Sequence, residues 1–224
     1  MSNSTNIPLE YGCYYHIYNR GINGTPLFYI PENYEHFLRL YDKYIIPIAD
    51  TFAWCLMGNH FHLLVRIKEV DEINIKLLPN PVRVLNPDRV EVIKPPHLYF
   101  SHLFNSYTQS VNKQQKRTGS LFERPFHRLK ITSDKYFRNL VVYIHQNPVH
   151  HGFTSDFRDY PWSSYGSIIS LKPTKVEREE VLEWFGGRDN FFDLHREIVD
   201  PEMIKGIFFP NPDRVLNPVR VQTI

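Results

Sequence analysis

Two rhythms of apolar and polar residues run along the chain, and they predict strands and helices in turn. Strand-forming residues fill four segments: Cys13–Asn19, Ile45–Met57, His60–Ile67 and Phe126–Ile131. The Gly58–Asn59 pair, between the second and third of these, is typical of a tight hairpin turn.

Helical spacing of apolar residues marks three segments between and after these strands: Pro31–Tyr41, Leu98–Lys116 and Lys135–His145. Ser133 can cap the third helix, and Asn147–Pro148 is expected to end it. The order strand, helix, two strands, helix, strand, helix predicts an α+β fold. We expect a ferredoxin-like, mainly antiparallel sheet with helices on one face.

The last part of the chain predicts a helical extension. Val176–Phe185 has a helical pattern that Gly186 and Gly187 end, and Phe191–Val199 has another. The expected organisation is a main domain over 1–165, an accessory helical region over 166–209 and a tail over 210–224. The main domain contains an insertion at about 70–98.

A repeated peptide marks both the insertion and the tail. Asn80–Val90 recurs as Asn211–Val221 with Asp and Val exchanged at two positions. Asn-Pro pairs favour turns, so both copies are expected in surface extensions. The two forms of the repeat can also be encoded by DNA sequences that are reverse complements of each other and palindromic about a central base. The repeated peptides therefore have two possible origins: hairpin-forming DNA inserted in the gene, or duplication of a turn-forming peptide. The codons of the gene would distinguish the two.

Composition and charge narrow the class of protein. With 42% hydrophobic and 15% aromatic residues the chain is typical of a folded globular protein. No apolar run is long enough to span a bilayer, and Met1–Glu10 lacks a signal-peptide pattern. Two cysteines in apolar surroundings, Cys13 and Cys55, suggest buried thiols in a reducing cytoplasm, with no membrane partner.

Charge is segregated along the sequence. The segment 112–138 holds eight Lys or Arg and two acidic residues, a local charge of +6 (8 − 2), whereas the rest of the chain carries 18 basic and 22 acidic residues. Such a distribution predicts one face that meets an anion, for which phosphate is a candidate. A solvated helix surface is the plainer interpretation of a basic run alone.

Two histidines stand at alternate positions of a predicted strand. Because alternate strand residues point to one face, His60 and His62 should project together while Phe61 points back to the core. Two neutral imidazoles side by side are suitable ligands for a divalent cation. A His-x-His pattern is short, however, and is also compatible with a half-exposed strand that binds nothing.

A tyrosine in a polar stretch of a predicted helix is the second candidate. Tyr107 could attack a phosphodiester if a metal polarised the phosphate, and its phenol would need help to lose its proton. It is equally compatible with an apolar helix stripe that includes Leu103 and Val111. Asn112 or Gln109 could complete a metal shell, although Asn112 lies about 140° round an ideal helix from Tyr107.

Four blocks in order resemble a known family. Gly58–Val65 resembles the His-hydrophobe-His box of single-tyrosine transposases, and Ser106–Lys113 followed by Arg117–Phe122 resembles their tyrosine helix. Tyr143–Gly152 and Trp162–Tyr165 are similar to further blocks. Together they resemble the REP-associated tyrosine transposases over roughly residues 11–165.

The resemblance implies an activity and its parts. It implies a transposase that cleaves and rejoins single-stranded hairpin DNA through a 5′-phosphotyrosine at Tyr107, with Mg²⁺ or Mn²⁺ held by His60 and His62. Asn112 is the candidate for the third ligand. It implies a monomer or homodimer associated with the nucleoid. Basic residues would bind the DNA backbone: Lys113, Lys116, Arg117, Arg124, Arg128 and Lys130.

Three alternatives remain open at this point. A domesticated protein could bind hairpin DNA without cleaving it. A metal hydrolase could use His60 and His62 to activate water, and its activity would survive Tyr107→Phe. A structural protein could carry these motifs by coincidence.

Overall fold

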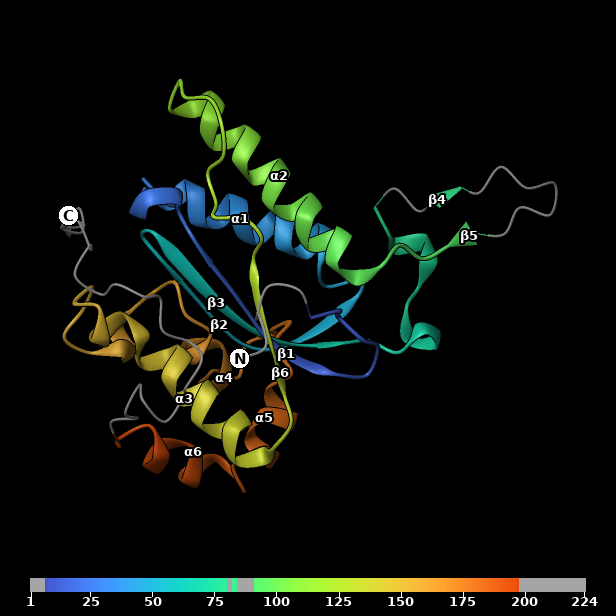
Figure 1. Cartoon of the computed structure of the whole chain (residues 1–224). Helices are drawn as coiled ribbons and strands as arrows, with labels where there is room; N and C mark the ends of the chain where they lie inside the picture. The colour runs from blue at the N-terminus through green and yellow to red at the C-terminus, as the bar shows by residue number, and fades with distance from the viewer. Residues whose placement is uncertain (1–6, 80–81, 84–90, 198–224) are drawn as a thin grey trace.

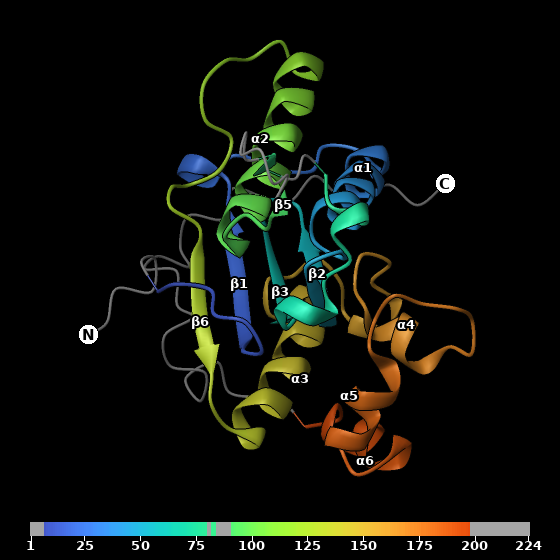
Figure 2. The same ribbon diagram turned by 90° about the vertical axis from the view of Figure 1, so that its right-hand side faces the viewer.

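The chain folds around one antiparallel sheet. The computed structural model describes residues 7–79, 82–83 and 91–197 (Figure 1). Four strands lie in the order β2–β3–β1–β6, all neighbours antiparallel (Figure 2). Their bounds are β1 (Tyr14–Arg20), β2 (Ala49–Met57), β3 (His60–Ile67) and β6 (His127–Ile131). The α+β class and the antiparallel sheet predicted from the sequence are confirmed.

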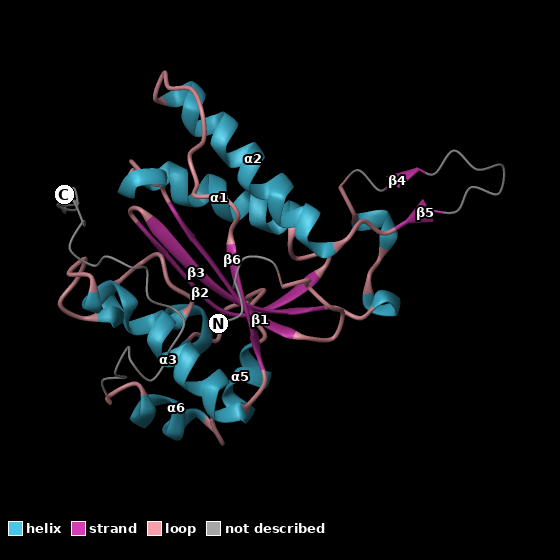
Figure 3. Cartoon of the chain, in the orientation of Figure 1, coloured by secondary structure: helices cyan, strands magenta, loops and turns pink. Residues whose placement is uncertain are grey.

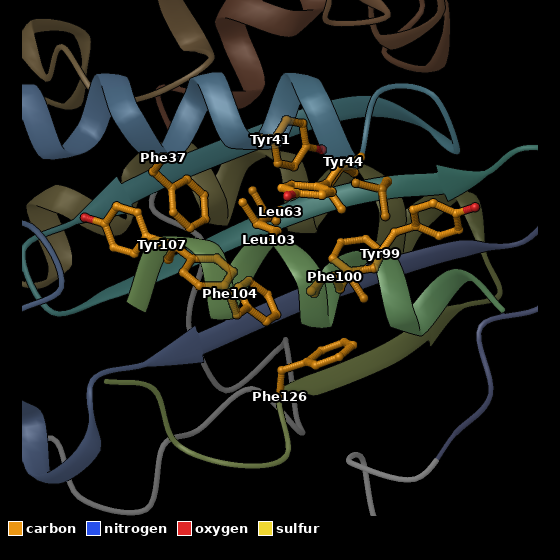
Figure 4. Close-up of a cluster of buried hydrophobic side chains, with 14 of the residues drawn as sticks. Phe37, Tyr41, Tyr44, Leu63, Tyr99, Phe100, Leu103, Phe104, Tyr107 and Phe126 are labelled. Atoms are coloured by element: carbon orange, nitrogen blue, oxygen red, sulfur yellow. The ribbon is translucent and has the colours of Figure 1, made fainter. Parts of the chain in front are cut away.

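Two helices cover one face of the sheet. α1 (Pro31–Tyr44) and α2 (Pro96–Gln114) lie side by side over it (Figures 1 and 3). Figure 4 shows the aromatic core that they enclose with the sheet. In this core Phe61 and Leu63 of β3 pack with Phe37 of α1 and Leu103 of α2. Residues 45–48, predicted as the start of a strand, form turns instead because α1 continues to Tyr44.

The third long helix lies on the opposite face, so the expectation of helices on one face is wrong. α3 (Asp134–His150) packs against β2 and β3 from below in Figure 1. The reason is that both faces of the central strands are apolar. Leu64 of β3 and Phe52 of β2 point away from α1 and α2 and pack against Leu140 and Ile144 of α3. A sheet that is apolar on both faces needs cover on both.

α3 is also longer than predicted. Ser133 caps its start as expected, accepting a hydrogen bond from the Tyr136 amide. Its end differs, because the helix continues through Asn147 and Pro148 to His150. A proline this near the end of a helix removes one hydrogen bond, and the next turn still closes with the His151 amide donating to the Asn147 carbonyl. This extra turn keeps Asn147 inside the helix.

The C-terminal helices pack beside α3. They are short: α4 (Tyr165–Ile169), α5 (Arg178–Trp184) and α6 (Arg188–Leu194). A buried chain of hydrogen bonds ties them to the core. His195 donates from Nδ1 to the Phe191 carbonyl (2.7 Å) and its Nε2 accepts from His145 Nδ1 (2.8 Å), while His145 Nε2 accepts from the Ser164 hydroxyl (2.9 Å). Burial lowers the pKa of His195 to about 4 and that of His145 well below its usual value, so both rings are neutral at pH 7.

The inserted segment leaves the sheet on the α1–α2 side. After two short 3₁₀ turns (Val70–Glu72 and Ile75–Leu77), β4 (Val82–Arg83) pairs with β5 (Glu91–Val92). Three parts of the chain lie outside the described residues: 80–81 and 84–90 of the first repeat, 198–209 of the predicted accessory region, and the whole of the 210–224 tail. Of the helices that the structure describes, none combines the length and apolar character needed to cross a bilayer.

Candidate active site

The two histidines of β3 project from one face of the sheet, as their alternation predicts. His60 and His62 are 4% and 1% exposed, and both lie on the face that α3 covers. Phe61 between them packs in the core on the α1–α2 face. The strand therefore presents two imidazoles to α3.

α3 presents a row of polar side chains to these imidazoles. Tyr143, Asn147 and His151 are spaced by four residues, which places them along one flank of the helix. The Tyr143 ring meets the His62 ring edge-on with centroids 5.7 Å apart, and the His151 ring lies 4.6 Å from the His60 ring. The side chain of Asn147 places its Oδ1 3.3 Å from His60 Nε2. A phenol, an amide and two imidazoles thus meet between β3 and α3.

Hydrogen bonds fix the orientation of both imidazoles. His60 Nδ1 lies 2.7 Å from Asn59 Oδ1, an atom that only accepts, so Nδ1 carries the proton and Nε2 the lone pair. His62 Nδ1 lies 2.9 Å from His16 Nε2 on β1. Burial lowers the pKa of His60 to about 3 and holds that of His62 well below its usual value. Neutral rings oriented through Nδ1 are the form in which histidine binds a metal ion.

The donor set fits a divalent cation. His60 Nε2 and Asn147 Oδ1 are two acceptors that face each other across 3.3 Å. Two neighbouring ligands of an octahedral ion with bonds of roughly 2.1 Å lie about 3 Å apart. A cation bound to both atoms would therefore replace the repulsion between these two acceptors by two favourable bonds. Across residues 7–79, 82–83 and 91–197, no three His, Cys, Asp or Glu side chains group as a metal site. The amide of Asn147 is the group that would complement His60 and His62.

A stack of rings extends the site across the sheet. His16 and Tyr18 of β1 stack with centroids 4.6 Å apart, His16 stacks on His62 at 5.0 Å, and Tyr18 stacks on His127 of β6 at 4.9 Å. His16 is fully buried, and burial lowers its pKa to about 3. These rings contact His62 from its strand side and form a continuous row of aromatic side chains from β3 to the edge strand β6.

Tyr107 is not part of this site, which corrects the expectation that it meets the two histidines. It lies on α2, on the other face of the sheet, with its ring fully buried beside Phe37 and Phe28 (Figure 4). Its hydroxyl donates to the Leu27 carbonyl at 2.8 Å. Burial raises the pKa of the phenol far above its ordinary value. The sheet separates Tyr107 from His60 and His62, so it acts as a core residue.

Asn112 is also placed away from the histidines. It lies in the last turn of α2, on the same side of the sheet as Tyr107, and its Nδ2 donates to the Gly119 carbonyl at 2.9 Å. The side chain thus holds the loop that follows α2. The amide oxygen that lies beside His60 is that of Asn147.

The basic residues expected to bind DNA are divided between two places. Those at the end of α2 are Lys113 and Lys116, both exposed, and Arg117, which donates to the Ser120 carbonyl. Those before and on β6 are Arg124, exposed, Arg128, which lies over the Phe126 ring, and Lys130, which pairs with Glu10 at 2.6 Å. On β6, His127 shares a face with the histidines, together with Leu129 and Ile131, whereas Arg128 and Lys130 point to the other face.

Comparison with known proteins gives one curated relative and one solved structure. A Haemophilus influenzae protein with the provisional name REP-associated tyrosine transposase is 29% identical over 119 residues, which cover 52% of this chain and 58% of the relative. A solved structure of a REP-associated tyrosine transposase bound to a REP hairpin is similar in fold, with a TM-score of 0.53 and 16% identity over 77% of this chain and 89% of that one. This chain resembles the REP-associated tyrosine transposases in sequence and in fold. No protein-family model matches it.

The match to the curated relative spans less than two thirds of that protein's length. The solved structure is below 25% identity, so its likeness concerns the fold.

Sequence reasoning missed the groups that α3 contributes. The block Tyr143–Gly152 was among those that resemble REP-associated tyrosine transposases, but no role was drawn from it. The signal was present in the spacing, since Tyr143, Asn147 and His151 fall on one flank of a helix only if that helix passes Pro148. His16 and Tyr18 are likewise alternate residues of a predicted strand, the same pattern as His60 and His62.

Proposed function

We propose that this chain is a transposase-type DNA strand transferase that cleaves and rejoins single-stranded hairpin DNA, with Tyr143 as the nucleophile. One observation carries the proposal: the Tyr143 phenol and the Asn147 amide of α3 stand against His60 and His62 of β3 within one chain. The likeness to REP-associated tyrosine transposases supports hairpin DNA as the substrate. Because one chain provides all four groups, the site needs no second copy of the protein.

The reaction at Tyr143 is a transesterification. The phenol oxygen attacks the phosphorus, the bond from phosphorus to the 3′ oxygen breaks, and the 5′ strand end stays on the enzyme as a phosphotyrosine. The leaving 3′ oxygen takes up a proton, and the phenol gives its proton to a base on the open side, where His150 is the exposed neighbour of Tyr143. A later attack by a 3′-hydroxyl reverses these steps and rejoins a strand. No nucleotide cofactor is needed because the phosphotyrosine conserves the energy of the broken bond.

The surroundings of Tyr143 control its ionisation. Burial raises the pKa of its phenol, while the Asn147 amide lowers it by stabilising the phenolate. His60, His62 and Asn147 would hold Mg²⁺ or Mn²⁺, which when bound supplies Lewis-acid polarisation of the scissile phosphate. Asn59 and His16 orient the two imidazoles for that purpose.

The basic residues would bind the DNA backbone. Lys113, Lys116 and Arg117 lie at or just after the end of α2, on the face opposite the histidines. Arg124 precedes the edge strand β6, and Arg128 and Lys130 alternate with His127 along it. DNA bound to these residues would pass the β6 edge to reach the site. A strand crossing this edge would meet His127 and then the ring stack that leads to His62. Such a protein would work at the nucleoid.

The test is a covalent adduct assay on matched tyrosine variants. Labelled single-stranded hairpin DNA is incubated with the full chain and Mn²⁺ or Mg²⁺, and protein–DNA adducts are separated under denaturing conditions. Tyr143→Phe should abolish the adduct, because the nucleophilic oxygen is removed. Tyr107→Phe, a change of the same atom on the other side of the sheet, should retain it.

Other outcomes identify other activities. Hairpin binding with no adduct from the wild-type chain would favour a domesticated, non-catalytic DNA-binding protein. Cleavage that survives Tyr143→Phe would favour a metal hydrolase that activates water. Loss of the adduct in Tyr18→Phe with retention in Tyr143→Phe would move the nucleophile to β1 and refute the assignment.

A further inference from the structure

The two candidate metal ligands of β3 differ in what holds them. His60 Nδ1 faces the amide oxygen of Asn59, which can only accept, so the lone pair of His60 lies on Nε2. His62 Nδ1 faces another imidazole nitrogen, His16 Nε2, at 2.9 Å. Because each nitrogen of a neutral imidazole can carry the proton or the lone pair, this contact can form in two directions. The hydrogen bonds therefore fix the tautomer of His60 but not that of His62.

The second nitrogen of His16 lies in apolar surroundings. His16 belongs to β1, which runs between β3 and β6 (Figure 2), and it is fully buried. Its ring plane is within 12° of that of His62, and the Tyr18 ring lies 4.6 Å from it. Its cross-strand neighbours are Leu64 and Leu129, which offer no side-chain acceptor. Among the residues that the structure describes, none makes a hydrogen bond with His16 Nδ1.

Only one direction of the His16–His62 hydrogen bond suits a cation. When His16 Nε2 donates, His62 carries its own proton on Nε2, and His16 Nδ1 keeps a lone pair. When His62 Nδ1 donates, the lone pair of His62 lies on Nε2, where a cation can bind, and His16 Nδ1 carries a proton. In passing from the first to the second, one proton moves from His16 to His62, one leaves His62 Nε2 and one arrives at His16 Nδ1. Both rings stay neutral throughout.

The buried position of His16 Nδ1 decides which direction prevails without a cation. The second direction places an N–H group there with no acceptor in the described structure. Proteins leave buried N–H groups without an acceptor more rarely than buried acceptors without a donor, because the lost hydration of the N–H is not replaced. The first direction is therefore favoured in the metal-free protein. A bond from a cation to His62 Nε2 can offset the cost of the second.

We propose that His16 is a positioning residue that makes cation binding at His62 depend on reversal of this hydrogen bond. In the metal-free protein His16 donates, and the proton on His62 Nε2 blocks that ligand. In the metal-bound protein His62 donates and His16 accepts. The inference rests on the proposed metal site of His60, His62 and Asn147, and it adds β1 to that site as the element that regulates its affinity for the cation.

The experiment follows the protons on the imidazole nitrogens by NMR. The full chain is labelled with ¹⁵N-histidine, because the ¹⁵N shift of a ring nitrogen distinguishes an N–H group from a lone pair. Zn²⁺ is the probe, since it is diamagnetic and imidazole is one of its preferred ligands. The chain has eleven histidines, and the signals of His16 and His62 are identified by their loss in His16→Gln and His62→Gln. No DNA is present.

Without Zn²⁺ we expect the protons of His16 and His62 on Nε2 of both rings, and at saturation on Nδ1 of both. His16→Phe keeps a ring but removes the acceptor, so Zn²⁺ binding measured by calorimetry should weaken by about tenfold or more. His16→Gln should recover most of this affinity, because its amide oxygen can accept from His62 Nδ1. His36→Gln is the control and should change nothing, since His36 lies on α1, beyond the sheet, beside the Ser110 hydroxyl.

Three results would overturn the inference: a proton already on His62 Nδ1 in the metal-free protein, a His16 ring that does not change when His62 does, or equal Zn²⁺ affinity in the wild-type chain and His16→Phe. The first two come from the wild-type chain, so misfolding of a variant cannot hide them. A His62 ring that does not respond to Zn²⁺ would refute the metal site and this inference together. Reversal at His16 and His62 in a protein that forms no DNA adduct would refute only the proposed strand transfer.

Discussion

The variant Tyr107→Phe, which lacks only the phenol oxygen, distinguishes a structural role of Tyr107 from a catalytic one. The Tyr107 hydroxyl is fully buried and donates to the Leu27 carbonyl at 2.8 Å. Tyr107→Phe leaves the ring in place and leaves that carbonyl without its side-chain donor. A buried polar group that loses its partner costs about 1–3 kcal/mol. For a domain of this size the midpoint of thermal unfolding should fall by about 2–12 °C.

Two measurements on the same protein test this reasoning. Thermal unfolding followed by circular dichroism gives the loss of stability, and the hairpin adduct assay gives activity at a temperature where both proteins are folded. We expect lower stability and an adduct yield close to that of the wild-type chain. An unchanged unfolding midpoint together with loss of the adduct would mean that Tyr107 is the nucleophile after all and that the sheet does not separate the two groups in the active protein.

Three further predictions concern the buried histidines His145 and His195, the metal ligands and the DNA contacts. Burial lowers the folded-state pKa values of His145 and His195, so the unfolded state binds protons more readily, and the free energy of unfolding should fall as the pH drops below about 6.5. With a folded pKa of about 4, His195 should account for a loss of about 2 kcal/mol between pH 7.5 and pH 5. Urea unfolding measures this loss, and a flat profile would contradict it. Asn147→Ala should weaken Mn²⁺ binding by about tenfold or more in calorimetric titration, whereas Asn112→Ala should leave it unchanged, and the reverse order would restore Asn112 as the ligand. Lys113→Gln should reduce the slope of log affinity against log salt for hairpin DNA by about 1, and an unchanged slope would remove it from the DNA contact.

The sequence predicted the elements better than the faces they cover. Alternation along β3 placed His60 and His62 on one face and Phe61 on the other, because this periodicity is a local property of a strand. Which face of the sheet α2 or α3 covers depends on how the connecting segments cross the sheet. The sequence of the helix itself does not show this. Tyr107 and Tyr143 both sit in apolar helical patterns, so sequence alone could not rank them.

The end of α3 shows how a local signal misled. Asn-Pro favours a turn, and this rule took Asn147 out of the predicted helix. In the structure Pro148 is one of the buried residues of α3, and the burial of this last turn outweighs the single hydrogen bond that the proline removes. The third candidate ligand was therefore hidden by a rule that is sound on average.

Because the site is divided between a strand and a helix, the rate of its reaction should depend on how the core between them is packed. The phenol and the amide belong to α3 and the two imidazoles to β3. The distance between α3 and β3 is set by the side chains packed between them, among them Leu64, Leu140 and Ile144. Adding or deleting a methylene there would widen or narrow the gap as a whole while leaving the spacing inside each half intact. Substitutions that never touch DNA or metal should accordingly tune the rate of strand transfer.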